Sequence, residues 1–139
     1  VAIGRVLSPE VSATSLLVRL DPFTGKRVVT PPATVVGELN RRFPMDSQGG
    51  LHFTILYGVL DLRSFELRYA CGGHPQPVHH TLQGRATFAP GDGLAVGWVD
   101  DVEFDEFTLQ LAPGDRLWLY SDGVPEAMDR FVDRFRGEG

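Results

Sequence analysis

The chain has few of the residues that define several common protein classes. Cys71 is the only cysteine among 139 residues, so neither a disulfide nor a cluster of thiolate metal ligands can form within the chain. Basic residues are outnumbered, with 13 Lys and Arg against 18 Asp and Glu and a formal net charge of -5. Because a phosphate backbone is bound by a basic surface, we predict no nucleic-acid partner.

Long apolar runs and targeting signals are also missing. No stretch approaches the roughly 20 apolar residues that cross a bilayer, and no basic segment followed by a hydrophobic one opens the chain. We therefore predict no membrane association, and the single cysteine fits a cytoplasmic location. The sequence begins with Val1 rather than Met, and we expect it to be a piece of a longer protein, truncated at both ends.

The chain does contain enough apolar residues for one core, since 42% of its residues are hydrophobic. We predict a single domain over residues 1–139, of the α+β class because helical and strand patterns occur in blocks. Residues 1–6 are apolar and β-branched, as in a strand. A helix start at residues 8–10 (SPE) and the apolar spacing that follows predict a helix as far as Leu20.

A second helix is predicted from Pro31, with Thr30 as its cap and Pro44 as its end. The pattern then changes to short β-rich runs between turn residues, which predicts strands, the first two of them joined as a hairpin. These runs lie at residues 53–60, 65–71, 78–82, 86–88 and 116–120. In residues 102–111 the apolar parity changes near Asp105, which predicts a β-bulge.

The last predicted element begins at Pro125. Its apolar residues fall on one helical face, which predicts an amphipathic helix that packs on a sheet. These residues are Ala127, Met128, Phe131, Val132 and Phe135. Glu126 stands in the first turn of this helix, where a carboxylate complements the helix dipole, and we predict that role for it rather than metal binding.

Residues 111–123, LAPGDRLWLYSDG, run from a turn through a strand to Asp122, at a position where a carboxylate can hold a metal. Read with residues 54–78, TILYGVLDLRSFELRYACGGHPQPV, this segment resembles the PPM-type (PP2C-like) phosphatases of the bacterial SpoIIE/RsbU class. The resemblance implies a PP2C-like sandwich of antiparallel sheets flanked by helices. It also implies a metal-dependent enzyme in which two Mn²⁺ or Mg²⁺ ions assist removal of phosphate from Ser or Thr of signalling proteins.

The chain departs from the family pattern at its first metal motif. Arg5 stands where the family has its bridging Asp, and residues 9–10 (Pro-Glu) stand where the family has His-Gly. A positive charge beside two dications repels them. The remaining metal-binding acids of the family would fall outside residues 1–139, which leaves Asp122 as the one metal-ligand position matched in this sequence. We assign no catalytic residue.

Two polar clusters have a structural interpretation. The turn at residues 72–75 (GGHP) resembles a family turn in which the histidine braces the loop and the glycines allow unusual backbone angles. His79 and His80 are adjacent and point to opposite faces of a strand, so they cannot chelate one ligand. Trp98 and Trp118 are predicted to be core or sheet-face residues rather than stacking platforms.

Motifs for other reactions are missing. Ser121 does not stand in a Gly-x-Ser-x-Gly elbow, and Walker and dinucleotide fingerprints are absent. Cys71 ends an apolar strand without a basic partner in the sequence, and we predict that it is a buried small hydrophobe.

Three interpretations stay open. The first is a catalytically impaired binding or regulatory module, a pseudophosphatase. By the resemblance, its partner would be an anti-anti-sigma-like phosphoprotein in a partner-switching system, or a sensor or receiver domain. The second is an active Mn- or Mg-dependent protein Ser/Thr phosphatase that acts on such a phosphoprotein. The third is a homodimerisation module.

Overall fold

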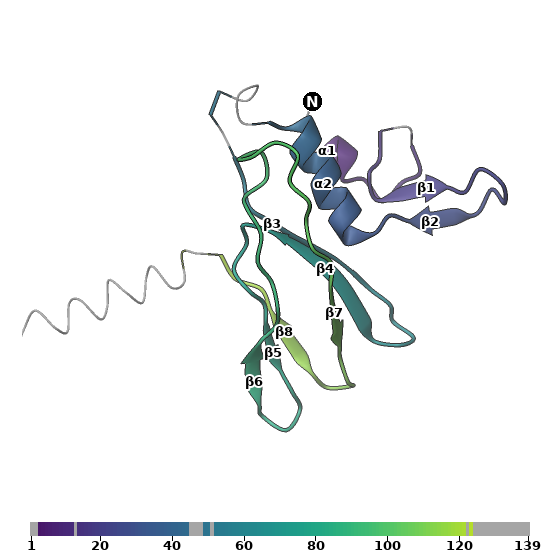
Figure 1. Cartoon of the computed structure of the whole chain (residues 1–139). Coiled ribbons are helices and arrows are strands. Elements are labelled where there is room, and N and C mark those ends of the chain that lie inside the picture. The colour runs from purple at the N-terminus through teal and green to yellow at the C-terminus, as the bar shows by residue number, and fades with distance from the viewer. Residues whose placement is uncertain (1–2, 13, 45–48, 51, 122, 124–139) are drawn as a thin grey trace, which may run out of the picture.

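The computed structural model shows antiparallel sheets with two helices (Figure 1). The described residues are 3–12, 14–44, 49–50, 52–121 and 123. In chain order, the elements are α1 (Ile3–Val6), β1 (Val18–Leu20), β2 (Arg27–Val29), α2 (Pro32–Arg42), β3 (Ile55–Leu60), β4 (Glu66–Gly72), β5 (Val78–His80), β6 (Ala86–Phe88), β7 (Phe107–Gln110) and β8 (Arg116–Trp118). Helices and antiparallel strands in blocks confirm the α+β class.

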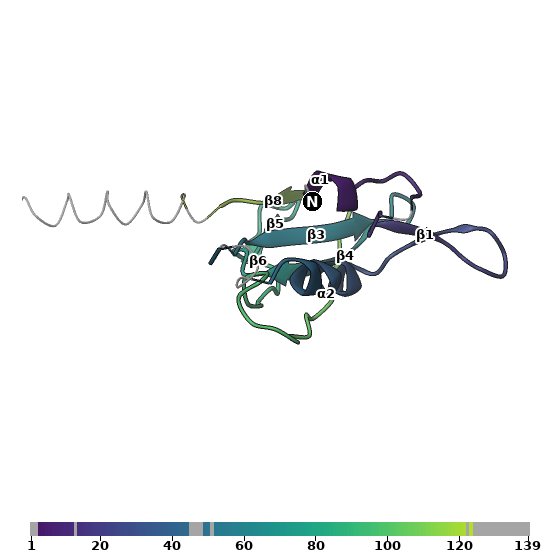
Figure 2. The same ribbon diagram turned by 90° about the horizontal axis from the view of Figure 1, so that it is seen from above.

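The strands form three sheets, with the orders β1-β2, β3-β4-β7 and β6-β5-β8. One face of the β3-β4-β7 sheet packs against α2, where Ala70 shares a buried cluster with Val35 and Leu39. The other face packs against the β6-β5-β8 sheet, where Tyr69 contacts the cluster that includes Leu117. Neighbouring residues of β4 therefore face two different cores, as the alternation of a strand requires. Figure 2 shows α2 on one side of β3 and β8 on the other.

The predicted hairpin is confirmed as β3–β4. It could be predicted because residues close together in the sequence determine it. The strands pair antiparallel, with Leu60 opposite Leu67. In the turn, Asp61 Oδ1 accepts N–H bonds from Arg63 at 2.8 Å and from Ser64 at 3.3 Å. These backbone bonds lower the pKa of the Asp61 carboxyl. Strands β5, β6 and β8 also fall inside their predicted runs.

Both predictions for the N-terminal part are wrong. Residues 3–6 form helix α1 rather than a strand, and the described residues from 9 to 17 form no helix. The Ser15 N–H donates to Ser12 Oγ at 3.1 Å, and the Ser15 hydroxyl donates to Ser8 O at 2.6 Å. Serine side chains that bond the nearby backbone in this way compete with helix formation.

The end of the predicted first helix is strand β1, which pairs with β2 in a projecting hairpin (Figure 1). Val18 lies opposite Val29. At the tip, Asp21 Oδ1 accepts N–H bonds from Phe23 at 3.0 Å and Thr24 at 2.6 Å. These bonds lower the pKa of the Asp21 carboxyl and hold a tight turn. β-Branched residues beside such a turn favour a hairpin over a helix.

Two smaller predictions also need correction. Strand β7 begins at Phe107 and residues 102–106 are irregular, so the parity change near Asp105 marks the approach to a strand and not a β-bulge. Helix α2 has Pro31 at its N-cap without a side-chain cap bond, while Thr30 is buried. No helix in the described ranges is long and apolar enough to cross a bilayer.

Candidate functional site

The predicted first metal position carries Arg5 on helix α1. Arg5 is exposed, whereas its neighbour Val6 is the buried residue of this short helix. Residues 9–10, which stand at the family's His-Gly position, are exposed, and the Glu10 N–H donates to Ser8 Oγ at 3.2 Å. This segment therefore presents a cation on a helix where the resemblance implies a carboxylate after a strand.

Asp122, Glu126 and the helix predicted from Pro125 lie outside the described residues. Within the described ranges, no three side chains of His, Cys, Asp or Glu lie close enough together to hold a metal ion. Three Asp carboxylates are used in turns instead, where backbone N–H groups donate to them and lower the pKa of each carboxyl. They are Asp21, Asp61 and Asp115. The described residues therefore do not fit a two-metal centre.

The GGHP turn is tightly packed. The Gly73 N–H donates to Gly93 O at 3.0 Å. Gly73 has a φ of 66°, and a Cβ there would lie 2.8 Å from Ala95 Cα, so this position requires glycine. His74 Nδ1 donates to Pro75 O at 2.8 Å. The histidine braces the turn, as predicted.

Cys71 is a buried thiol, as predicted. It is 1% exposed, and burial together with the nearby Asp92 raises its pKa to about 11. The neighbouring Tyr69 is fully buried and its hydroxyl donates to Pro90 O. Burial and the nearby Cys71 raise the pKa of Tyr69 to about 12. Because the thiolate is the nucleophilic form of cysteine, Cys71 is not a candidate nucleophile.

The two histidines of β5 do not form one site. His79 Nε2 lies 2.7 Å from Asp115 Oδ2. Asp115 also accepts N–H bonds from Ala112 at 2.9 Å and Leu82 at 3.1 Å. The Ala112 bond first, and the His79 bond second, lower the pKa of the Asp115 carboxyl. Sequence reasoning missed this pair, because its members are 36 residues apart and share no motif.

The two tryptophans are both more than half exposed. Trp118 is 55% exposed on β8, which agrees with the predicted sheet-face position. Trp98 is 56% exposed in a loop, so its prediction as a core or sheet-face residue is wrong. Its ring is stacked on His52, with the centroids 5.8 Å apart.

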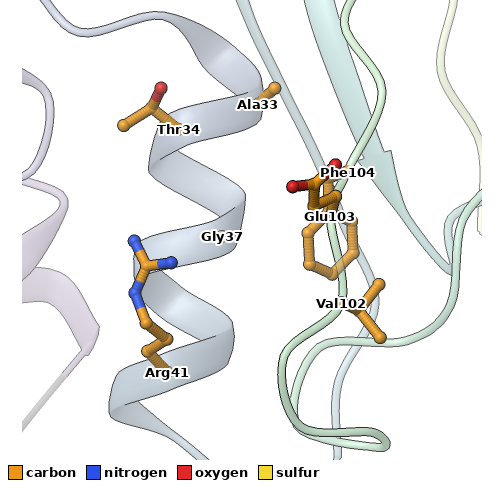
Figure 3. Close-up of a pocket in the computed structure, with 7 residues that line it drawn as sticks. All are labelled: Ala33, Thr34, Gly37, Arg41, Val102, Glu103 and Phe104. Atoms are coloured by element: carbon orange, nitrogen blue, oxygen red, sulfur yellow. The ribbon is translucent and has the colours of Figure 1, made fainter.

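A groove of about 280 Å³ lies between α2 and the irregular segment at residues 102–104 (Figure 3). Its lining comes from Ala33, Thr34, Gly37 and Arg41 of α2 and from Val102, Glu103 and Phe104 of the facing segment. Gly37 has no side chain to fill the groove from the helix side, and a Cβ at this position would meet no atom within 4 Å. Sequence reasoning missed this groove, because its two walls are far apart in the chain and carry no motif.

Glu103 and Arg41 are the charged residues that line the groove, and further acidic residues flank Glu103 in the sequence. Residues 100–106, DDVEFDE, carry five carboxylates in seven residues. Glu106 accepts the Ala33 N–H at 3.4 Å and lies 3.7 Å from Arg68. The Arg41 guanidinium is paired with a glutamate of its own helix, Glu38.

Asn40 fixes α2 beside the loop that precedes this acidic segment. The side chain is 3% exposed. Its Oδ1 accepts the Gly97 N–H at 2.7 Å, and its Nδ2 donates to Val99 O at 2.9 Å. The Gly97 bond is buried and the Val99 bond is partly buried, so this amide links the helix to the loop.

A solved structure matches about two thirds of this chain. The crystal structure of the RsbU and RsbW domains of Rv1364c from Mycobacterium tuberculosis matches with a TM-score of 0.57 and 25% sequence identity. The match covers 66% of this chain and 25% of that chain. The fold is therefore that of a SpoIIE/RsbU-type, PP2C-like phosphatase domain. Residues 2–139 match the family model of stage II sporulation protein E (SpoIIE), and the chain belongs to that family.

Two curated relatives come from Bacillus subtilis (strain 168). Phosphoserine phosphatase RsbU is 30% identical over 97 residues, which cover 68% of this chain and 29% of the relative. Phosphoserine phosphatase RsbP is 25% identical over 125 residues, which cover 86% of this chain and 31% of the relative. The chain thus spans less than a third of the length of these relatives.

Proposed function

We propose that this chain is a binding or regulatory domain of a bacterial signalling protein, a pseudophosphatase that keeps the phosphatase fold with an impaired metal site. Arg5 carries the proposal. Its side chain is exposed on α1, at the position where the resemblance implies a bridging carboxylate. A guanidinium is always charged near neutral pH and repels a dication placed beside it.

A domain of this kind would bind a protein partner without hydrolysing its phosphate. The groove beside α2 is the surface that we propose for such contact, because it combines the buried Phe104 with the charged side chains of Glu103 and Arg41. The partner would be an anti-anti-sigma-like phosphoprotein in a partner-switching system, or a sensor or receiver domain. This choice rests on family analogy, since fold alone does not determine function.

An active phosphatase is the second candidate. RsbU and RsbP, to which the chain is similar, are phosphoserine phosphatases, and Asp122 stands at the matched metal-ligand position. In this case Asp122, together with acids outside the described residues, would hold Mn²⁺ or Mg²⁺. The metal would supply neutralisation of phosphoryl charge and activation of the nucleophile.

Phosphate release from a phosphoserine peptide in Mn²⁺ separates these two functions. In the full-length parent protein, which would supply the remaining metal-binding acids, we expect no Mn²⁺-dependent turnover by the wild type and a gain of turnover in Arg5→Asp. Arg19→Asp, at another exposed arginine, is the matched control for the change in charge. Turnover by the wild type that equals that of Arg5→Asp would contradict the proposal.

A further inference from the structure

The β1–β2 hairpin is an exposed arm of the molecule. It projects away from the other sheets (Figure 1 and Figure 2), and neither of its strands contacts another described helix or strand. Its apolar side chains are therefore open to solvent. Phe23 at the tip is 96% exposed, Leu20 is 53% exposed and Val29 is 44% exposed. The arm presents apolar surface that adds to neither buried cluster of the chain.

Hydrogen bonds hold the tip of this arm in one conformation. Asp21 Oδ1 accepts the N–H groups of Phe23 and Thr24, and it also accepts the Thr24 hydroxyl at 2.9 Å. The Gly25 N–H donates to Asp21 O at 2.9 Å, and the φ of this glycine is 65°. Because these bonds fix the backbone on both sides of Phe23, docking of its ring costs little conformational entropy. Phe23 is thus a preorganised anchor.

The arm is basic, whereas the chain as a whole is acidic. Residues 18–29 contain three basic residues and one acidic residue, Asp21, in a chain with a net charge of -5. Lys26 and Arg27 follow the tip directly, and neither belongs to an ion pair among the described residues. The Arg27 guanidinium donates to a backbone carbonyl, Pro9 O, at 3.2 Å. The anchor therefore has uncompensated positive charge beside it.

The groove beside α2 has complementary features. Val102 and Phe104 line one wall, and the exposed Glu103 stands between them. Three further exposed carboxylates are close to Glu103 in the sequence, and none of the four is in an ion pair within the described ranges. They are Asp100, Asp101 and Asp105. The volume of about 280 Å³ is below the range of about 300–1,000 Å³ typical of small-molecule pockets, which suits a single large side chain.

We propose that the β1–β2 hairpin of one copy of this chain docks in the α2 groove of a second copy, with Phe23 in the groove and Lys26 and Arg27 beside Glu103. The opposite charges of the two surfaces attract and orient the copies before contact. Removal of the Phe23 ring from water then stabilises the contact. Because the contact joins two different surfaces, it is a head-to-tail one.

The contact is weak by its size. A hairpin tip buries much less than the roughly 800 Å² that each partner buries in a stable interface, so we expect a dissociation constant on the order of 0.1 mM. A docked copy covers the surface that we propose for the protein partner, so self-association would compete with partner binding. This consequence rests on the proposed function, whereas the self-association itself does not.

Sedimentation equilibrium of the full chain tests the proposal, at protein concentrations up to about 1 mM. Phe23→Ser removes the anchor, and Glu103→Lys reverses the charge at the groove. Leu62→Ser, at a 74% exposed position in the β3–β4 turn, is the matched control for loss of an exposed apolar side chain. Resistance of Cys71 to a thiol reagent shows that each variant is folded, because this thiol is buried.

We expect the average mass of the wild type and of Leu62→Ser to rise with concentration, and added salt to weaken the association. Phe23→Ser and Glu103→Lys should each raise the dissociation constant about tenfold or more. An equal mixture of these two variants should associate again, because Phe23→Ser keeps the groove and Glu103→Lys keeps the anchor.

Three results would overturn the proposal. The first is a monomer mass of the wild type at every concentration. The second is association that Phe23→Ser leaves unchanged, because the anchor would then lie outside the contact. The third is a mixture of Phe23→Ser and Glu103→Lys that associates no more strongly than either variant alone, because the hairpin and the groove would then not be the two sides of one contact.

Discussion

At Gly93 the chain passes so close to β4 that no other residue fits. The φ of this glycine is 148°, and a Cβ would lie 2.3 Å from Cys71 O. The Gly93 carbonyl accepts the Gly73 N–H at the same point. A side chain here would push apart the GGHP turn and the loop that faces it.

We predict that Gly93→Ala lowers the free energy of unfolding by about 3 kcal/mol, from backbone strain and steric overlap together. Urea unfolding measures the change. Gly84→Ala is the control, because Gly84 also has a positive φ, of 87°, but has open space around it. We expect it to cost about 1 kcal/mol. Equal losses in the two variants would contradict the role of the close contact.

Asp115 is one of three described carboxyls, with Asp21 and Asp61, whose lowered pKa makes stability depend on pH. Its ordinary pKa of 3.8 is lowered in the folded chain by the Ala112 N–H and by His79. A lowered folded pKa means stability that is present above pH 3.8 and is lost as the pH falls through the folded value. We predict that Asp115→Asn unfolds with less acid dependence below pH 3.8. Asp100→Asn controls for the loss of one negative charge. An acid dependence unchanged in Asp115→Asn would contradict this prediction.

At the scale of elements, one buried amide holds α2 in place. The two hydrogen bonds of Asn40 connect the helix to Gly97 and Val99. Helix packing on β3 and β4 fixes one side of α2, and Asn40 fixes its end beside the loop. The groove next to α2 therefore depends on this side chain for its shape.

We predict that Asn40→Ala lowers the free energy of unfolding by about 2 kcal/mol, because the buried Gly97 N–H and the partly buried Val99 carbonyl lose their partner. Thr34→Ala, on the exposed side of the same helix, should change stability by less than about 0.5 kcal/mol. Urea unfolding of both variants gives the comparison. A loss of similar size in Thr34→Ala would contradict the role of the buried amide, because Ala has a higher helix propensity than Thr and this exposed change should not destabilise the helix.

The sequence predicts those elements whose causes are local. The β3–β4 hairpin follows from its alternation and from the Asp61 turn, and α2 follows from its prolines and apolar stripe. The N-terminal helix was predicted from a proline and apolar spacing, but serine bonds and pairing with β2 outweigh these signals. The groove and the His79–Asp115 pair join distant segments, and no short motif indicates such contacts.

For the molecule as a whole, we propose that the phosphatase fold is present without the metal chemistry of the family. The chain belongs to the SpoIIE family and resembles an RsbU domain in structure. Three of the described acids accept hydrogen bonds in turns, and Arg5 stands where the resemblance implies a metal-binding carboxylate. The proposed binding role is compatible with this fold, since one fold can carry several functions.

Calorimetric titration of Mn²⁺ into the wild-type chain tests this account most directly, with Asp122→Ala as the matched control. We predict no saturable binding at millimolar Mn²⁺ in either protein, because Arg5 repels the metal and one carboxylate is too few ligands to hold it. Tight binding by the wild type that is lost in Asp122→Ala would contradict the account. It would show a working metal site in this domain.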